Sequence, residues 1–150
     1  MKITDALLAE HTVFHQLFDY LETAIQRCRT LPEVRSQARL LESLLEDHSK
    51  AEEELLIAPL DHCLEQIGQR ELFDKEHEEI DGSLRQAVAT RDLKLARKAL
   101  LTAVLASRRH FDKEERVIFP LAEKVLKART LNELGDIWIS RRNKIKPRRS

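Results

Sequence analysis

Residues 110–121 read HFDKEERVIFPL, and residues 48–60 read HSKAEEELLIAPL. In both stretches a glutamate follows four residues after a histidine, and a proline comes ten or eleven residues after that histidine. Residues three and four apart share one side of a helix. If the first stretch is helical, His110 and Glu114 therefore both lie on the stripe that faces the core. Ionisable side chains in a buried stripe, at the same spacing in both stretches, require an explanation.

The composition favours a helical bundle. Only three glycines and four prolines interrupt 150 residues, and aromatic residues make up 5% of the chain against 35% for charged residues. The length corresponds to one domain with its own core. The formal net charge is zero, which argues against a dedicated nucleic-acid binder. Residues 141–150 hold six basic and no acidic residues, and we interpret them as a solvated terminus, with a weak anionic contact as the alternative.

Apolar residues recur at alternating steps of three and four, which is the spacing of a helical stripe. The first helix is expected to begin after Thr4 as its N-cap, and the TLPE stretch at 30–33 to end it and cap the second helix. Gly68 marks a stop, Asp92 caps the fourth helix, and the TLNE stretch at 130–133 opens a fifth. The sequence therefore predicts four long helices and one short one.

The connections between these helices are short, which favours antiparallel neighbours. We therefore predict an all-α fold, an up-down-up-down antiparallel four-helix bundle with a short C-terminal fifth helix. Residues 1–128 would form the bundle, and residues 129–150 the last helix and the basic tail. Pro59 and Pro120 should kink or end their helices, because proline lacks an N–H and clashes with the preceding turn. The buried stripe of the fourth helix is expected to comprise Ala96, Leu100, Ala103, Ser107, His110, Glu114, Val117 and Leu121.

Six ionisable residues occupy positions in the predicted stripes, and at ~1.5 Å per residue all six fall at one level near one end of the bundle. They are His11, His48, Glu52, His77, His110 and Glu114. Burying a charged carboxylate is costly, and a bound cation removes that cost because it accepts carboxylate and imidazole lone pairs. Four histidines and two glutamates are too many for one tetrahedral zinc and suit two metal ions bridged by carboxylates. Nitrogen and oxygen donors without thiolate favour iron or manganese, with zinc as an alternative.

The Glu-His pair at 10–11 recurs at 76–77, and the His-x-x-x-Glu-Glu segment at 48–53 recurs at 110–115. This arrangement resembles the hemerythrin-like HHE cation-binding family, over residues 1 to about 126. The resemblance implies a non-haem centre of two iron ions with an oxo or hydroxo bridge, and the binding of O2, NO or iron; some members handle peroxide or repair iron–sulfur clusters. It also implies roles for the six residues, with the four histidines as terminal ligands and the two glutamates as bridges.

The match to that family is incomplete on the third helix. Oxygen-carrying members have a second histidine there, four residues before the first, and here that position is Phe73. His15 lies one turn after the histidine of the first helix, and it is either an additional ligand or a residue at the flank of the bundle. Asp81 holds the equivalent place on the third helix and is a lesser candidate. Glu53 and Glu115 follow the bridging glutamates and are expected to support the ligands or to lie at the surface.

The leading hypothesis is a di-iron protein that binds, senses or stores O2, NO or iron, rather than a dedicated enzyme. The alternative is a di-iron enzyme that detoxifies peroxide or NO or repairs iron–sulfur clusters. A bundle without metal is the third reading, which treats each histidine as a hydrogen-bonded core residue. The expected partner is O2, NO or peroxide, with no nucleic acid and no membrane.

No signal peptide and no apolar run of membrane-spanning length is recognisable, so we expect a cytoplasmic protein. Cys28 and Cys63 lie outside any CxxC motif and at opposite ends of the predicted bundle, so two separate reduced thiols are expected. Trp138 lies between two isoleucines in the C-terminal segment. An apolar surface of this kind needs cover, which makes the segment a candidate contact for a homodimer.

Overall fold

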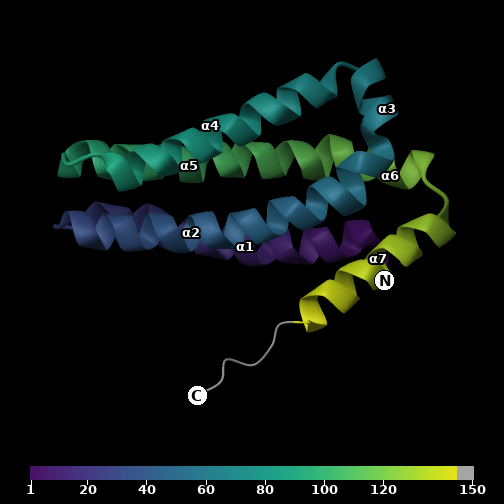
Figure 1. Ribbon diagram of the computed structural model, residues 1–150, viewed down its shortest axis with the longest axis horizontal. Helices are drawn as coiled ribbons and strands as arrows, with labels where there is room; N and C mark the ends of the chain where they lie inside the picture. Colours follow the sequence, from purple (N-terminus) through teal and green to yellow (C-terminus); the bar gives the residue numbers. More distant parts are fainter. Residues whose placement is uncertain (145–150) are drawn as a thin grey trace.

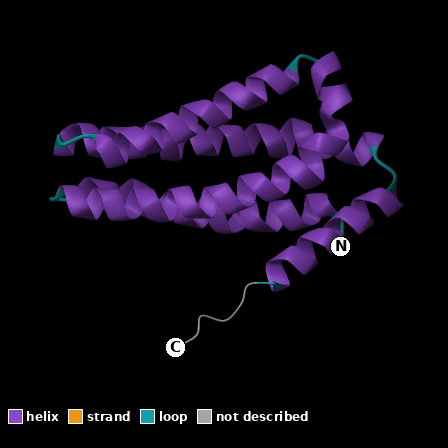
Figure 2. Ribbon diagram, viewed as in Figure 1, coloured by secondary structure: helices purple, strands orange, loops and turns teal. Residues whose placement is uncertain are grey.

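Four long helices pack side by side in the computed structural model, which describes residues 1–144 (Figure 1). They form two antiparallel hairpins, α1 with α2 and α4 with α5, and Figure 2 shows that only short loops connect the helices. Across the bundle, α1 lies against α5 and α2 against α4. The predicted all-α antiparallel bundle with a fifth helix is confirmed. The bounds of the long helices are Ile3–Arg27 for α1, Leu31–Glu52 for α2, Gln69–Ala89 for α4 and Leu93–Lys113 for α5.

The predicted caps at Thr30 and Asp92 are confirmed, and the predicted cap at Thr4 is wrong. The side chain of Thr30 accepts a hydrogen bond from the backbone of Glu33, and Asp92 accepts one from the backbone of Leu95. Thr4 does not cap α1, which begins at Ile3, after a residue that makes no side-chain cap. The Thr4 hydroxyl is buried and donates a hydrogen bond to Glu123 at 2.7 Å instead. A tertiary partner therefore replaces the local capping bond.

The helices α2 and α5 each continue through one wide π-helical turn. The turn η1 spans Glu53–Ile57 and leads into α3 (Ala58–Gln66), and η2 spans Glu114–Ile118 and leads into α6 (Phe119–Val125). A π turn has five-residue hydrogen-bond spacing, so it shifts the buried stripe by one residue. The predicted stripe position Val117 is consequently 40% exposed, and Ile118 is 1% exposed in its place. Leu121 is likewise only partly buried, whereas Ala122 is fully buried.

The prolines stand just after these π turns, near the start of the helix that follows each turn. The chain bends there rather than stopping, and Figure 1 shows α3 turned away from the axis of α2. Gly68 ends α3 in the left-handed conformation, at φ 71°, which glycine adopts without strain.

The fifth helix, α7 (Ala128–Asn143), packs on α1 near the N-terminus (Figure 1). It begins two residues before the TLNE stretch, so Thr130 lies inside the helix rather than at its cap. The contact is close at Gly135, where a Cβ atom would overlap the backbone carbonyl of Met1. Arg141 pairs with Glu54, so the start of the predicted basic tail is engaged with the bundle. Residues 145–150 of that tail lie outside the described residues.

The apolar core is divided into two clusters. One lies toward the α1–α2 connection and includes Phe18, Leu41 and Leu100, and the other lies near the N-terminus and includes Leu7 and Leu60. The level between them holds the buried ionisable residues of the bundle. Within residues 1–144, no helix combines the length and apolarity that a membrane span requires. The two cysteines are free thiols, Cys28 being buried and Cys63 partly exposed.

Candidate metal centre

The structure brings the six residues predicted from the sequence together at one level of the bundle. Five of them are buried, and His77 is partly exposed. Every long helix contributes a histidine. In α2 and α5 the histidine is followed one turn later by a glutamate of the same group. The glutamates stand at the boundary between the helix and its π turn. Whether these residues ligate a metal stays a prediction.

The donor atoms converge in two groups that share one carboxylate. His11, His48 and Glu52 offer donor atoms that all lie within 4.8 Å of one another. The same holds for Glu52 with His110 and Glu114. Glu114 also reaches toward the first group, with its Oε1 atom 3.9 Å from Nε2 of His11. The two carboxylates thus stand between the hairpins, in the position from which each could contact two cations.

The histidines meet through their Nε2 atoms. The Nε2–Nε2 distance is 3.2 Å between His11 and His48 and 2.9 Å between His77 and His110. Each glutamate lies 3.1 Å from Nε2 of the histidine one turn before it on the same helix. His77 belongs to neither three-residue group but touches the second one through His110.

Several buried polar atoms of this layer lack a hydrogen-bond partner among the described residues. They are Oε1 of Glu52, both carboxylate oxygens of Glu114 and Nδ1 of His11. An unpaired buried polar group costs about 1–3 kcal/mol, and a buried charge costs more unless it is paired or bound to a metal. Carboxylate oxygens and imidazole nitrogens are the donors that iron, manganese and zinc accept. The residues present therefore fit a bound divalent or trivalent cation, because it would satisfy the unpaired oxygens.

Two further carboxylates hold the histidines of α2 and α5, and the sequence reasoning assigned them no role. Glu10 Oε2 accepts from Nδ1 of His48 at 2.6 Å, and Glu76 Oε2 accepts from Nδ1 of His110 at 2.6 Å. A carboxylate on Nδ1 fixes the ring so that Nε2 faces the metal. The signal was present in the sequence as the repeated Glu-His pair, in which the glutamate holds a histidine of the neighbouring helix.

These contacts set the protonation of the layer. Burial alone would lower the pKa of His48, but its bonds to Glu10 and Glu52 outweigh burial and raise that pKa to about 9. Burial would raise the pKa of Glu76, but hydrogen bonds from His110 and Lys113 lower it to about 2. The Glu10 pKa is lowered in the same way, against burial, by His48 and Arg142.

Aromatic rings pack directly on the other two histidines. Phe111 stacks on His11 with ring centroids 3.8 Å apart and planes 5° apart, and Phe73 stacks on His77 at 4.4 Å. Burial, together with repulsion from His48, lowers the pKa of His11 to about 2, and burial lowers that of His77. Both rings are therefore neutral at physiological pH, the state in which imidazole binds a metal.

The four lesser candidates lie in different surroundings. His15 Nε2 is 3.2 Å from Glu115 Oε2 at the α1–α5 surface. Glu53 is paired with Arg70 at 2.7 Å on the opposite surface. Asp81 is exposed and lies beside His77. The structure thus places none of the four inside the buried layer, and their predicted roles at the metal remain untested.

One side of the layer opens to the surface between α2 and α4. A groove of about 590 Å³ there is lined by residues that include Ser49, His77 and Asp81. The same three residues also bound an inner cavity of about 10 Å³, together with Glu52 and His110. That volume corresponds to roughly one water molecule. His77 therefore borders both the outer groove and the inner cavity that lies against the buried donors.

A family model described as the hemerythrin HHE cation binding domain matches residues 2–122. That range contains the six predicted ligands and both supporting glutamates. No curated protein and no solved structure gives a significant match to the chain.

Proposed function

The chain belongs to the hemerythrin HHE cation-binding domain family, and from this premise we propose that it holds two iron ions and binds O2, NO or iron itself. Manganese and zinc are the alternatives for the metal. The six buried or partly buried residues of the candidate metal centre would hold the ions. Two bound iron ions would supply redox chemistry and open coordination positions for a small molecule.

The observation that carries this proposal is the sharing of Glu52 between two donor groups. A single-ion site would need one group of three or four donors. Here Glu52 lies within 4.8 Å of donor atoms on both hairpins, and Glu114 faces Nε2 of His11 across the bundle at 3.9 Å. Carboxylates and histidines that project inward from facing helices are the kind of side chain that holds a metal pair in the core of a helical bundle.

The size and location of the inner cavity favour a small ligand. A cavity of about 10 Å³ admits a molecule the size of water, whereas a larger organic substrate could approach no closer than the outer groove. His77 is the partly exposed histidine of the layer and borders both spaces. The chain's own contribution to ligand binding is therefore to orient the donors, exclude bulk water with Phe73 and Phe111, and leave one narrow approach.

Elemental analysis of purified protein tests the proposal directly. Close to two metal ions per chain are expected, and Glu52→Gln should lower the content of both because it removes the shared carboxylate. Glu46→Gln, on the exposed surface of the same helix, is the matched control and should retain both ions. A content of one ion or none, in protein purified without chelators and offered iron, manganese and zinc in turn, would contradict the two-metal proposal.

An enzyme remains the alternative function, because the same approach would admit peroxide. Stopped-flow spectra of the reduced iron-loaded protein distinguish the two. A binding protein should give a spectral change on adding O2 or NO that reverses when the gas is removed. Sustained consumption of peroxide or NO over many turnovers would favour the enzyme.

A further inference from the structure

A third group of donor side chains lies at the surface, where α1 meets the end of α5 and the π turn η2. His15, Asp112 and Glu115 each offer one donor atom, and the three atoms lie within 4.8 Å of one another. We propose that these residues, the peripheral cluster, bind one divalent transition-metal cation at a site separate from the buried centre. The cluster is accessible, because Asp112 is exposed and the other two residues are partly exposed.

Among the described residues, no lysine or arginine nitrogen lies within 4.0 Å of a carboxylate oxygen of the peripheral cluster. In this part of the chain, the salt-bridge partners of Glu115 within 4.0 Å are the two histidines His11 and His15. Asp112 has no such partner among these residues. Arg108, one turn before Asp112 on α5, is instead engaged by Asp19 and Glu22. Two carboxylates without a basic partner attract a cation, and an imidazole beside them supplies the nitrogen donor that a transition metal prefers.

The other hairpin provides an internal comparison. The positions equivalent to the peripheral cluster are held there by Asp81, Lys50 and Glu53. Glu53 is neutralised by Arg70, with Nη2 and Oε1 2.7 Å apart, and Lys50 places a positive charge where the cluster has a carboxylate. The two hairpins therefore share a backbone arrangement, but only the peripheral cluster combines a histidine with two carboxylates that have no basic partner.

A buried nitrogen adjoins the cluster. Nδ1 of His11 is fully buried and has no hydrogen-bond partner among the described residues, and Oε2 of Glu115 is 3.9 Å from it. One oxygen of this carboxylate can face His11 while the other faces a cation. With one nitrogen donor, two carboxylates and water in the remaining positions, the site suits Fe²⁺, Mn²⁺ or Zn²⁺. Three partly exposed donors predict weaker binding than at the buried centre.

Equilibrium dialysis against buffered Zn²⁺, with elemental analysis of the protein, tests the site. We expect two tightly bound zinc ions per chain and a third that binds more weakly. Asp112→Asn should weaken the third ion at least tenfold and leave the first two unchanged, and His15→Asn should do the same. Two controls should keep the third ion: His62→Asn removes an exposed histidine outside the cluster, and Asp81→Asn alters the equivalent position in the other hairpin. Circular dichroism of each variant verifies that the fold is retained.

Two results would overturn the peripheral site. One is a third ion that survives Asp112→Asn and His15→Asn but is lost in His62→Asn, which would identify adventitious binding. The other is an unchanged zinc isotherm in Asp112→Asn while Glu115→Gln weakens only the tight ions, which would assign Glu115 to the support of His11 alone. If wild-type protein binds a single weak zinc ion that Asp112→Asn abolishes, the peripheral site stands and the proposed function of the buried centre fails.

Discussion

Glu10 ties His48 to the C-terminal helix. Its Oε2 atom accepts from Nδ1 of His48 at 2.6 Å, and its Oε1 atom accepts from the indole of Trp138 at 2.7 Å. Arg142 donates to the same Oε1 atom at 2.8 Å. One histidine of the candidate metal centre is therefore held through Glu10 by two residues that lie 128 and 132 positions from that glutamate in the chain.

Replacing the supporting carboxylates should weaken metal binding without removing a ligand. In Glu10→Gln and Glu76→Gln, a neutral amide replaces the carboxylate that accepts a hydrogen bond from the imidazole Nδ1–H. The amide is a weaker acceptor, and loss of such a partner lowers metal affinity 10–100-fold. Competition with a chromogenic chelator measures the effect. Glu78→Gln is the matched control, because among the described residues Glu78 pairs only with Arg85 at the surface, and it should leave affinity unchanged. Equal affinities in all three variants would contradict the role assigned to these carboxylates.

The C-terminal helix should matter to both stability and metal affinity. Trp138→Phe keeps an aromatic ring but removes the N–H donor to Glu10. A hydrogen bond to a charged group contributes about 1.5–3 kcal/mol, so we expect urea midpoints to fall. Metal affinity should fall less than in Glu10→Gln, because Arg142 still holds the carboxylate. Arg129→Gln, in an exposed pair on the same helix, should change neither quantity measurably.

Glu114→Leu should separate stability from metal binding. Both carboxylate oxygens of Glu114 are buried without a hydrogen-bond partner among the described residues, so an apolar side chain of similar size removes a desolvation cost of about 1–3 kcal/mol. Metal-free Glu114→Leu should therefore unfold at higher denaturant than metal-free wild type, yet bind less metal. A variant that is less stable than wild type in both states would show that these oxygens are satisfied in solution without a cation.

The metal-free protein should lose stability on both sides of neutral pH. The pKa of His48 is raised from 6.5 to about 9, so its stabilising protonation is complete below pH 6.5 and is lost as pH rises through 9. The pKa of His11 is lowered to about 2, so below pH 6.5 the unfolded chain takes up a proton that the folded state refuses. Melting temperatures measured across pH 5–9.5 should show the loss of stability on the acid side and on the alkaline side. His48→Gln should abolish the loss on the alkaline side.

Blocking the approach between α2 and α4 should slow ligand binding and spare the metals. Ser49 lines both the outer groove and the inner cavity, and Ser49→Phe would fill them. The rate of NO binding to the reduced iron-loaded protein, followed by stopped flow, should fall at least tenfold while iron content stays unchanged. Ser36→Phe, on the same helix but far from the groove, is the control. An unaltered rate would point to a different entrance.

Local spacing was enough to predict most of the fold. Alternating steps of three and four predict amphipathic helices wherever the apolar residues are regular, and Thr30 and Asp92 cap through bonds that span only three residues. Thr4 has the same local chemistry, but its hydroxyl bonds to Glu123. A local pattern cannot show that a potential capping residue instead bonds to a partner 119 positions away.

The π turns explain the remaining errors in the buried stripe. Val117 and Ile118 are both apolar, so periodicity alone cannot decide which faces the core, and a wide turn at Glu114–Ile118 selects the second. His48, Glu52 and His110 precede those turns and Glu114 opens the second, so the one-residue shift that follows each turn did not affect the placement of the predicted ligands. The hydrogen bonds from Trp138 and Arg142 to Glu10 required knowing that α7 folds back on α1, which no short-range pattern encodes.

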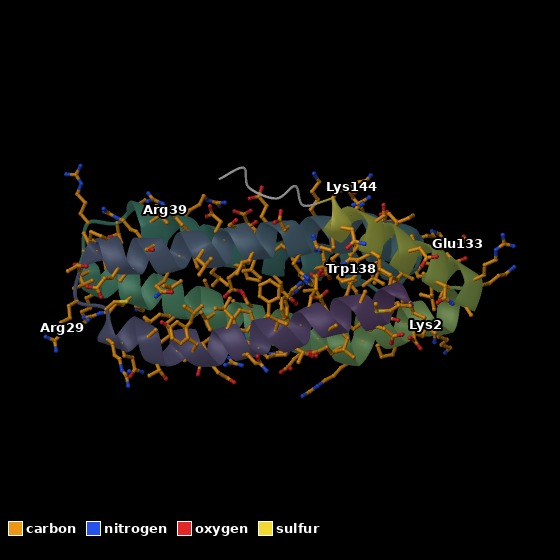
Figure 3. All side chains as sticks on the ribbon, turned by 90° about the horizontal axis from the view of Figure 1, so that it is seen from below. Lys2, Arg29, Arg39, Glu133, Trp138 and Lys144 are labelled. Carbon is orange, nitrogen blue, oxygen red and sulfur yellow. The ribbon has the colours of Figure 1, made fainter. Side chains whose placement is uncertain are left out.

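Trp138 is the chain's single tryptophan, and Figure 3 labels it where α7 meets the bundle. Its indole is connected to His48 through one carboxylate. The protein consequently carries a built-in fluorophore two hydrogen bonds from its candidate metal centre. Iron arriving there should quench its emission, so the loading and release of the cation can be followed in real time without any dye or label.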